Sequence, residues 1–250
     1  MDLELRGRCY VVTAASAGLG RATGEALLAE GAQVVAVARR QQVLDDWAAD
    51  HDGTLVPLAA DLADPTTPQR ACDLAVERFG RLDGALVSVG GPPRGQVLGN
   101  TDQEWLDGFG SVFLPALRLA RAATTTAAAA VLGFVLSTSV KSPLATMAIS
   151  NGLRPGLAML VKQLGDEIAP QGGRTFAMLP GLIDTERLQV LRRASPDPEQ
   201  ARREQEASIP MGRLGRPEEF GAVAAFLLSP KASYINGSVI AVDGGSMRAL

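Results

Sequence analysis

Two glycines lie shortly after the first apolar run of the chain, in a pattern that can bind phosphate groups. The run Cys9–Thr13 leads into Ala14-Ala15-Ser16-Ala17-Gly18-Leu19-Gly20, and a helical pattern begins at once. At such a strand-to-helix turn, backbone N–H groups and the positive end of the helix face an anionic pyrophosphate. Glycines let the backbone approach the phosphates and let the helix pack on the strand. The pattern predicts a dinucleotide site, although an ordinary strand-to-helix turn can carry the same residues. The predicted contacts are Thr13, Ser16, Gly18, Leu19 and Gly20.

Two arginines, and no acidic residue, follow the second apolar run, Gln33–Ala38. In folds of this kind, an acidic side chain here hydrogen-bonds the free 2′-hydroxyl of NAD, whereas an arginine accepts the 2′-phosphate of NADP. Arg39 therefore favours NADP over NAD as the cofactor. Arginines that merely cap a surface helix are the alternative interpretation.

Composition and charge narrow the class of protein. The chain has 250 residues, of which 46% are hydrophobic and 20% charged, so we expect one folded domain over residues 1–250. The net charge of −3 offers no basic excess for a nucleic acid. No apolar run approaches the ~20 residues of a membrane helix, and the first residues lack the apolar core of a signal peptide. We therefore expect a small-molecule substrate and neither a nucleic-acid nor a membrane partner.

Cysteine and histidine counts bear on the compartment and on metals. The two cysteines, Cys9 and Cys72, are too few for a disulfide scaffold, which favours the reducing cytoplasm. With His51 as the only histidine, a metal site of several His and Cys ligands is not expected.

Short apolar runs alternate with longer helical patterns along the chain. This alternation predicts an α/β fold, a single-domain Rossmann-type doubly wound parallel sheet of about seven strands with helices on both faces. The predicted strands are Cys9–Thr13, Gln33–Ala38, Thr54–Leu58, Gly84–Val89, Val131–Ser137, Thr175–Leu179 and Ser238–Val242. The predicted helices are Leu19–Glu30, Gln41–Ala49, Pro68–Phe79, Asp102–Thr126, Leu144–Ile168 and Pro217–Leu228.

One segment, 184–210, breaks this alternation. It is polar, rich in both arginines and acids, and contains Pro196 and Pro198. A mobile lid over a substrate cleft is one interpretation. A solvated helical excursion held by i,i+4 charge pairs is the other.

Several further segments, taken in order, are similar to one enzyme family. Asp61-Leu62 follows the third strand, Pro180–Thr185 follows the sixth, and the tail contains Ile209–Glu219 and Ile240–Gly245. These segments resemble the short-chain dehydrogenase/reductase family, in particular its 3-oxoacyl-acyl-carrier-protein reductases. The resemblance covers nearly the whole chain and implies further cofactor contacts. These are Asp61, Leu62, Gly90, Arg154, Pro180, Gly181, Ile183 and Thr185.

The catalytic residues expected from this resemblance are replaced. Family members reduce a carbonyl with a Tyr-x-x-x-Lys pair, in which the lysine lowers the pKa of the proton-donating tyrosine. Here Ser150 stands at the tyrosine position and Arg154 at the lysine position, while Ser137, thirteen residues before Ser150, matches the family's serine. Val112 replaces the asparagine of the preceding long helix, and Ala14 the first glycine of the phosphate turn.

These replacements weaken the acid–base centre but keep the cofactor outline. Ser150 is shorter and far less acidic than tyrosine, whereas Arg154 can still hydrogen-bond ribose hydroxyls. Ser137 is expected to orient the substrate, and Ser139 and Lys141 are the remaining candidates for proton transfer, with a solvated loop lysine as the alternative for Lys141. Pro155 removes a helical N–H, so we expect the helix to bend or to end just before it.

The motif Ser-Asn-x-x-Arg at residues 150–154, with the nearby Val140-Lys141, resembles a divergent branch of the family. Two hypotheses follow from these features. One is an NADP-dependent oxidoreductase acting on a carbonyl/alcohol pair with an atypical acid–base site. The other is a catalytically inactive nucleotide-binding module that acts through binding or assembly. The family pairs its two long central helices across a dimer axis, so we expect a homodimer or homotetramer.

Overall fold

Seven parallel strands form one sheet in the computed structural model, which describes residues 1–249. The strands are β1 (Cys9–Thr13), β2 (Gln33–Ala38), β3 (Leu55–Ala59), β4 (Gly84–Val87), β5 (Val131–Val135), β6 (Arg174–Pro180) and β7 (Ser238–Val242). Their order is β3-β2-β1-β4-β5-β6-β7, and every neighbouring pair is parallel. The predicted Rossmann-type fold is confirmed. The strand order reverses between β1 and β4, and such a reversal opens a ligand crevice at the carboxyl ends of the strands.

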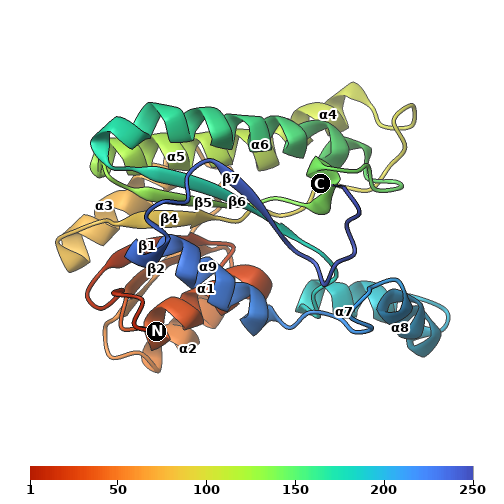
Figure 1. Cartoon of the computed structure of the whole chain (residues 1–250), viewed down its shortest axis with the longest axis horizontal. Helices are drawn as coiled ribbons and strands as arrows, with labels where there is room; N and C mark the ends of the chain where they lie inside the picture. Colours follow the sequence, from red (N-terminus) through yellow and green to blue (C-terminus); the bar gives the residue numbers. More distant parts are fainter. Residues whose placement is uncertain (250) are drawn as a thin grey trace.

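Helices cover both faces of this sheet, with α3, α5 and α6 on one side and α1, α2 and α9 on the other (Figure 1). Their bounds are α1 (Gly18–Ala29), α2 (Gln41–Ala49), α3 (Thr67–Phe79), α4 (Asp102–Gly108), α5 (Leu114–Thr126), α6 (Ala148–Ile168) and α9 (Pro217–Leu228). Within residues 1–249, none of the helices is long and apolar enough to cross a membrane.

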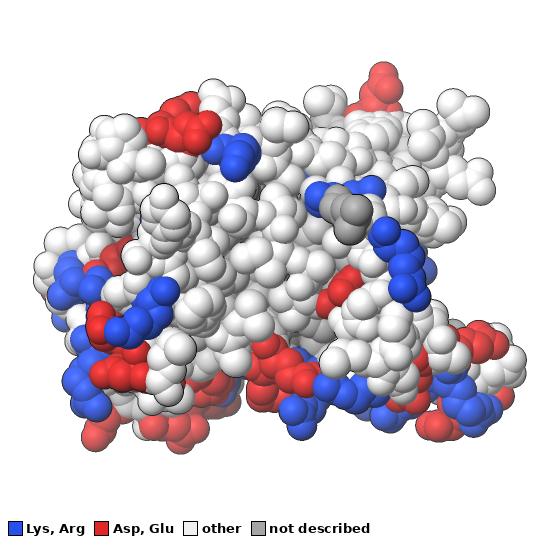
Figure 2. Space-filling model, viewed as in Figure 1, with Lys and Arg blue, Asp and Glu red and all other residues white. Residues whose placement is uncertain are grey.

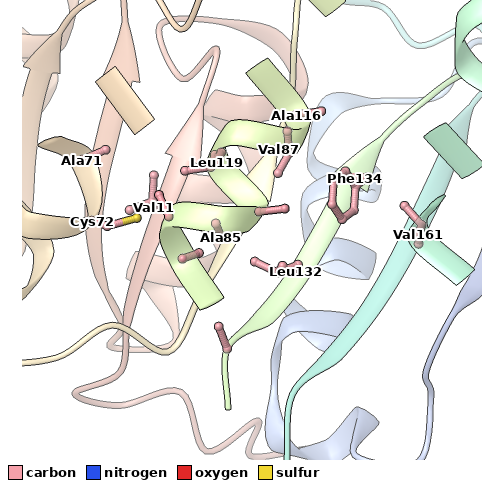
Figure 3. Close-up of a cluster of buried hydrophobic side chains, with 14 of the residues drawn as sticks. Val11, Ala71, Cys72, Ala85, Val87, Ala116, Leu119, Leu132, Phe134 and Val161 are labelled. Carbon is pink, nitrogen blue, oxygen red and sulfur yellow. The ribbon is translucent and has the colours of Figure 1, made fainter. Parts of the chain in front are cut away.

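Each face of the sheet has its own apolar core. Figure 3 shows the core under α3 and α5, where Val11 of β1 meets Cys72 and Leu119 of these helices. Because parallel strands are buried on both faces, the sequence shows continuous apolar runs. On the opposite face α1 and α9 lie so close that a Cβ on Gly221 would be 2.4 Å from the carbonyl oxygen of Ala22.

The predicted helix Asp102–Thr126 is helical throughout but contains a wider turn. Residues Phe109–Phe113, between α4 and α5, form a π-helical segment. Pro115, two residues after this segment, has no N–H to donate, and in a regular α-helix its ring would press against the carbonyl of Ser111. Val112, at the position of the family's asparagine, is 1% exposed in this segment and belongs to the core.

The predicted start of the helix Leu144–Ile168 is wrong, because α6 begins at Ala148. Thr146 has φ +56°, which a right-handed helix cannot accommodate. The backbone here bonds instead to another loop: Gly95 N donates to Thr146 O at 2.8 Å, and Ala148 N donates to Gly95 O at 3.2 Å. Further along, α6 runs through Pro155, so it does not end there.

The polar segment 184–210 forms two short helices, α7 (Glu186–Arg193) and α8 (Pro198–Ala207), which project beyond the sheet (Figure 1). Neither helix contains a buried residue in the described chain. A cavity of about 300 Å³ separates α8 from the residues just before α9, and its lining is mostly charged. This placement beside the crevice is the one expected of a lid, and that function stays a prediction.

Candidate active site

The turn between β1 and α1 leaves the first N–H groups of the helix available to an anion. Among the described residues, no side chain caps α1 and no acidic residue lies in its first turn. Gly20 permits this packing, because a Cβ there would lie 2.6 Å from the carbonyl oxygen of Thr13. Gly18 and Ala14 have φ of +59° and +51°, so the alanine holds a conformation that favours glycine. Leu19 is half-buried against the core beneath α1. The turn fits the pyrophosphate of a dinucleotide.

Thr13, predicted to contact the cofactor, directs its hydroxyl into the sheet instead. The side chain is fully buried, donates to Ser88 O at 2.6 Å and accepts from Ser88 N at 2.8 Å. These two bonds tie the end of β1 to the residue after β4. The Thr13 side chain therefore shapes the crevice from within the sheet.

Arg40, which the sequence analysis did not single out, reaches the phosphate turn. Its Nε donates to Ser16 Oγ at 3.1 Å, and its Nη2 donates to Ser16 O at 3.0 Å. Arg40 also pairs with Glu186 at the start of α7, at 3.3 Å. Arg39 is exposed at the end of β2. Two guanidinium groups, rather than Arg39 alone, thus lie where a 2′-phosphate is expected.

Three other predicted cofactor contacts lie beyond the carboxyl ends of β3 and β4. Asp61 is exposed and accepts a hydrogen bond from Ala63 N at 2.9 Å. Leu62 is half-buried beside it. Gly90 is exposed, and a Cβ added there would meet no described atom within 4 Å. All three lie along the edge of the sheet where the crevice opens.

The segment after β6 closes against the phosphate turn. Pro180 ends β6, and a Cβ on Gly181 would lie 2.7 Å from the backbone that follows β7. Ile183 is buried, and Thr185 caps α7 by accepting from the backbone N of the third residue of that helix at 3.4 Å. A Cβ on Gly18 would lie 3.4 Å from the methyl carbon of Thr185. The segments at Gly18 and Thr185, far apart in the sequence, therefore lie against each other beside the crevice.

Two serine hydroxyls lie close together, one of them at the position of the family's tyrosine. The Ser139 and Ser150 oxygens are 3.4 Å apart, and both residues are buried. Ser137, selected by its spacing from Ser150, uses its hydroxyl to accept from Ser139 N at 3.1 Å. It thereby starts the 3₁₀ turn Thr138–Val140. The structure brings Ser139, rather than Ser137, to Ser150.

Arg154 brings a buried positive charge to this end of the sheet. It is 6% exposed, and its Nη1 donates to Val135 O, at the end of β5, at 3.1 Å. Burial and the nearby charge of Arg187 lower the pKa of Arg154 to about 10. The Arg187 guanidinium lies against Gly91, where a Cβ would be 2.8 Å from Nη2. Arg154 remains charged at neutral pH.

The loop 141–147 carries Lys141 and is held by Asn151. The Asn151 side chain accepts from Leu144 N at 3.1 Å and donates to Leu144 O at 2.8 Å. Lys141 itself is exposed and follows the 3₁₀ turn that begins with the serines. The asparagine of Ser-Asn-x-x-Arg thus positions the loop that bears the candidate proton donor.

Other ionisable groups are poorly suited to proton transfer at this site. Tyr10 donates to Leu228 O at 3.2 Å on the far side of the sheet, and burial raises its pKa well above the ordinary value. Burial also raises the pKa of Cys9 and Cys72 to about 12. Within residues 1–249, no group of three or more His, Cys, Asp or Glu residues could hold a metal ion.

Comparison with known proteins shows which family has this fold and these segments. A family model described as enoyl-(acyl carrier protein) reductase matches residues 13–247. The 3-oxoacyl-[acyl-carrier-protein] reductase of Escherichia coli K12 is 30% identical, over 97% of this chain and 98% of the relative.

Two solved structures are similar over the whole fold. L-sorbose reductase from Gluconobacter frateurii, complexed with NADPH and L-sorbose, has 27% identity and a TM-score of 0.93, covering 100% of both chains. An NADPH-bound short-chain oxidoreductase from Pseudomonas aeruginosa PAO1, described as containing an atypical catalytic center, has 27% identity and a TM-score of 0.90, covering 97% of this chain and 98% of that one. Together with the crevice and the matching segments around it, these likenesses show that the chain belongs to the short-chain dehydrogenase/reductase family and is similar to its 3-oxoacyl-acyl-carrier-protein reductases.

Proposed function

We propose that this protein is an NADPH-dependent oxidoreductase that interconverts a carbonyl compound and its alcohol with an atypical acid–base site. The observation that carries the proposal is the pair of hydroxyls of Ser139 and Ser150, 3.4 Å apart and next to the Arg154 segment of α6. They lie at the carboxyl end of β5, on the edge of the sheet where ligands bind. The similar short-chain oxidoreductase from Pseudomonas aeruginosa, described as containing an atypical catalytic center, supports this proposal.

The residues around the groove fit a phosphorylated dinucleotide. Its pyrophosphate would lie at the free N-terminus of α1, and Arg39 and Arg40 would bind a 2′-phosphate. Arg154 would hydrogen-bond ribose hydroxyls. Thr185 would lie beside the phosphate turn at Gly18. When bound, the nicotinamide supplies the hydride that reaches the carbonyl carbon. The NADPH complexes of the two similar structures support this choice of cofactor over NADH.

Reduction of a carbonyl also requires a proton at its oxygen. The serine hydroxyls can donate hydrogen bonds to that oxygen and orient it, but a serine is too weak an acid to supply the proton. Lys141 directly follows the 3₁₀ turn that contains Ser139, so it carries an ionisable side chain two residues from that serine. Lys231, in contrast, pairs with Glu4, remote from the strand ends. We assign the proton donor to Lys141.

Assembly into a homodimer or homotetramer is part of the proposal. A groove of about 270 Å³ between α5 and α6 is lined mostly by apolar residues. Figure 2 shows charged side chains gathered over α1, α9, α7 and α8, while the surface near α6 carries few. An apolar face on two long helices fits a second copy of the chain.

The buried, unlinked cysteines support a reducing compartment, the cytoplasm.

The direct test is calorimetric titration with NADPH and NADH, followed by a turnover screen on a panel of carbonyl compounds. We expect NADPH to bind about tenfold or more tightly than NADH, since the 2′-phosphate gains charge-assisted hydrogen bonds. Ser139→Ala and Lys141→Met are each expected to lower kcat/KM about tenfold or more, which corresponds to about 1.4 kcal/mol of transition-state stabilisation.

Ser142→Ala, in the same exposed loop, serves as the matched control and should keep its activity. Ser137→Ala separates the two candidate serines, since only the serine that orients the substrate should matter. If the protein binds NADPH but reduces no carbonyl in a broad panel, hydride transfer is the wrong function. In that event the nucleotide-binding module takes its place.

A further inference from the structure

Two buried arginines of this fold differ in how many hydrogen bonds their N–H groups donate. Arg174, 8% exposed, donates to the carbonyl oxygens of Ile235, Leu227 and Ser229 at 3.0–3.1 Å. Arg154 is equally buried, yet within residues 1–249 it donates to one carbonyl, that of Val135. A guanidinium has five N–H donors, and no nitrogen of Arg154 is among the described side-chain atoms that are fully buried without a hydrogen-bond partner. Arg174 is therefore a structural residue. Arg154 has further N–H donors that bind no carbonyl oxygen within residues 1–249.

A second guanidinium lies at the same edge of the sheet. Arg187 extends from the first turn of α7 onto Gly91, which follows β4, while Arg154 bonds to the last residue of β5. Since β4 and β5 are neighbours in register, both charges lie at the ends of adjacent strands. Their mutual repulsion contributes to the lowered pKa of Arg154.

No carboxylate in residues 1–249 forms an ion pair with either arginine. Next to them the chain does pair its arginines: Arg192 of α7 binds Asp184 at 3.1 Å, and Arg40 binds Glu186. Arg187 is exposed to solvent, whereas the charge of Arg154 is buried without a described carboxylate, at a cost that an anion bound beside it would reduce.

We propose that Arg154 and Arg187 together bind the carboxylate of the substrate, so that this enzyme acts on carbonyl compounds that are anions. The proposal rests on the proposed function and names its substrate class. Ribose hydroxyls can occupy N–H donors of Arg154, but they are neutral and leave both charges uncompensated. A carboxylate matches the planar fork of a guanidinium with two parallel hydrogen bonds. A phosphate of the cofactor offers the same chemistry, and the two sources are separable by experiment.

The test measures binding without turnover, so it stands apart from the turnover screen. Butyrate and butyramide have similar shapes and differ in charge, and neither has a reducible ketone. They are titrated calorimetrically into the wild-type protein with and without saturating NADP⁺. We expect butyrate to bind about tenfold more tightly than butyramide, and this preference to persist with NADP⁺ present.

Arg187→Gln and Arg154→Met should each reduce the preference for butyrate to within about twofold. Arg193→Gln, which removes an exposed arginine from the same helix, should leave it intact. Equal binding of the two probes by the wild type would overturn the proposal, as would a preference that survives in both cleft variants. A preference that NADP⁺ abolishes would also overturn it and assign the anion site to the cofactor. Failure of carbonyl reduction alone would contradict only the proposed function.

Discussion

Replacing Arg154 by methionine is expected to stabilise the protein, although it removes a residue of the candidate site. Burial and the nearby charge of Arg187 lower the pKa of Arg154 from its ordinary value, by more than two units, to about 10. At about 1.4 kcal/mol per pKa unit, keeping the charge costs about 3 kcal/mol at neutral pH. Methionine fills most of the same space, but Val135 O loses its donor, at a cost of about 1–2 kcal/mol. The free energy of unfolding should thus rise by about 1 kcal/mol, and Tm by roughly 2–4 °C.

The pH dependence of this gain has a definite sign. Below pH 10, Arg154 is protonated in both the folded and the unfolded protein, so its cost is constant there. Above that pH the folded protein releases the proton first, and the unfolded protein binds more protons. Wild-type stability attributable to this residue therefore rises with pH above 10, until the unfolded protein also releases this proton. The advantage of Arg154→Met should be steady at neutral pH and should shrink above pH 10.

Urea denaturation of the wild type and two variants checks this prediction. The matched control is Arg174→Met, which removes an equally buried arginine but leaves three carbonyl oxygens without their donor. That change should lower the free energy of unfolding by about 3 kcal/mol or more. A loss of the same size in Arg154→Met would refute the reasoning, because it would mean that both arginines are structural.

Two further substitutions test the walls of the site. In Gly20→Ala the new Cβ would lie 2.6 Å from Thr13 O, so α1 must shift; we expect a loss of about 1–3 kcal/mol in stability and much weaker NADPH binding. Gly110→Ala, where the Cβ meets no described atom within 4 Å, is the control, and equal losses in both variants would contradict the packing argument. Asn151→Ala removes both hydrogen bonds to Leu144, so amide exchange in residues 141–147 should accelerate and kcat/KM should fall. Unchanged exchange in that loop would show that the asparagine does not hold it.

The path of the loop after β5 explains why Ser139, rather than the serine chosen by spacing, lies beside Ser150. Counting thirteen residues back gives Ser137, but β5 ends at Val135, earlier than predicted, and a 3₁₀ turn follows. That turn carries Ser139 to within 3.4 Å of Ser150. After this turn, the chain continues as a loop where a helix start was predicted, and Thr146 in this loop has a positive φ. Side-chain proximity depends on this route through space, which residue counts do not contain.

The sequence by itself determined the fold class, the phosphate turn and the absence of the usual tyrosine and lysine, because these follow from local patterns. Apolar runs must be buried, and a strand followed at once by glycines and a helix forms its turn from neighbouring residues. Only the tertiary structure decided which distant groups meet: Arg40 at Ser16, and Arg187 at Gly91. The same holds for the single carbonyl partner of Arg154, since burial and charge compensation depend on what surrounds a side chain. Sequence reasoning therefore located the cleft, and long-range packing set its charge.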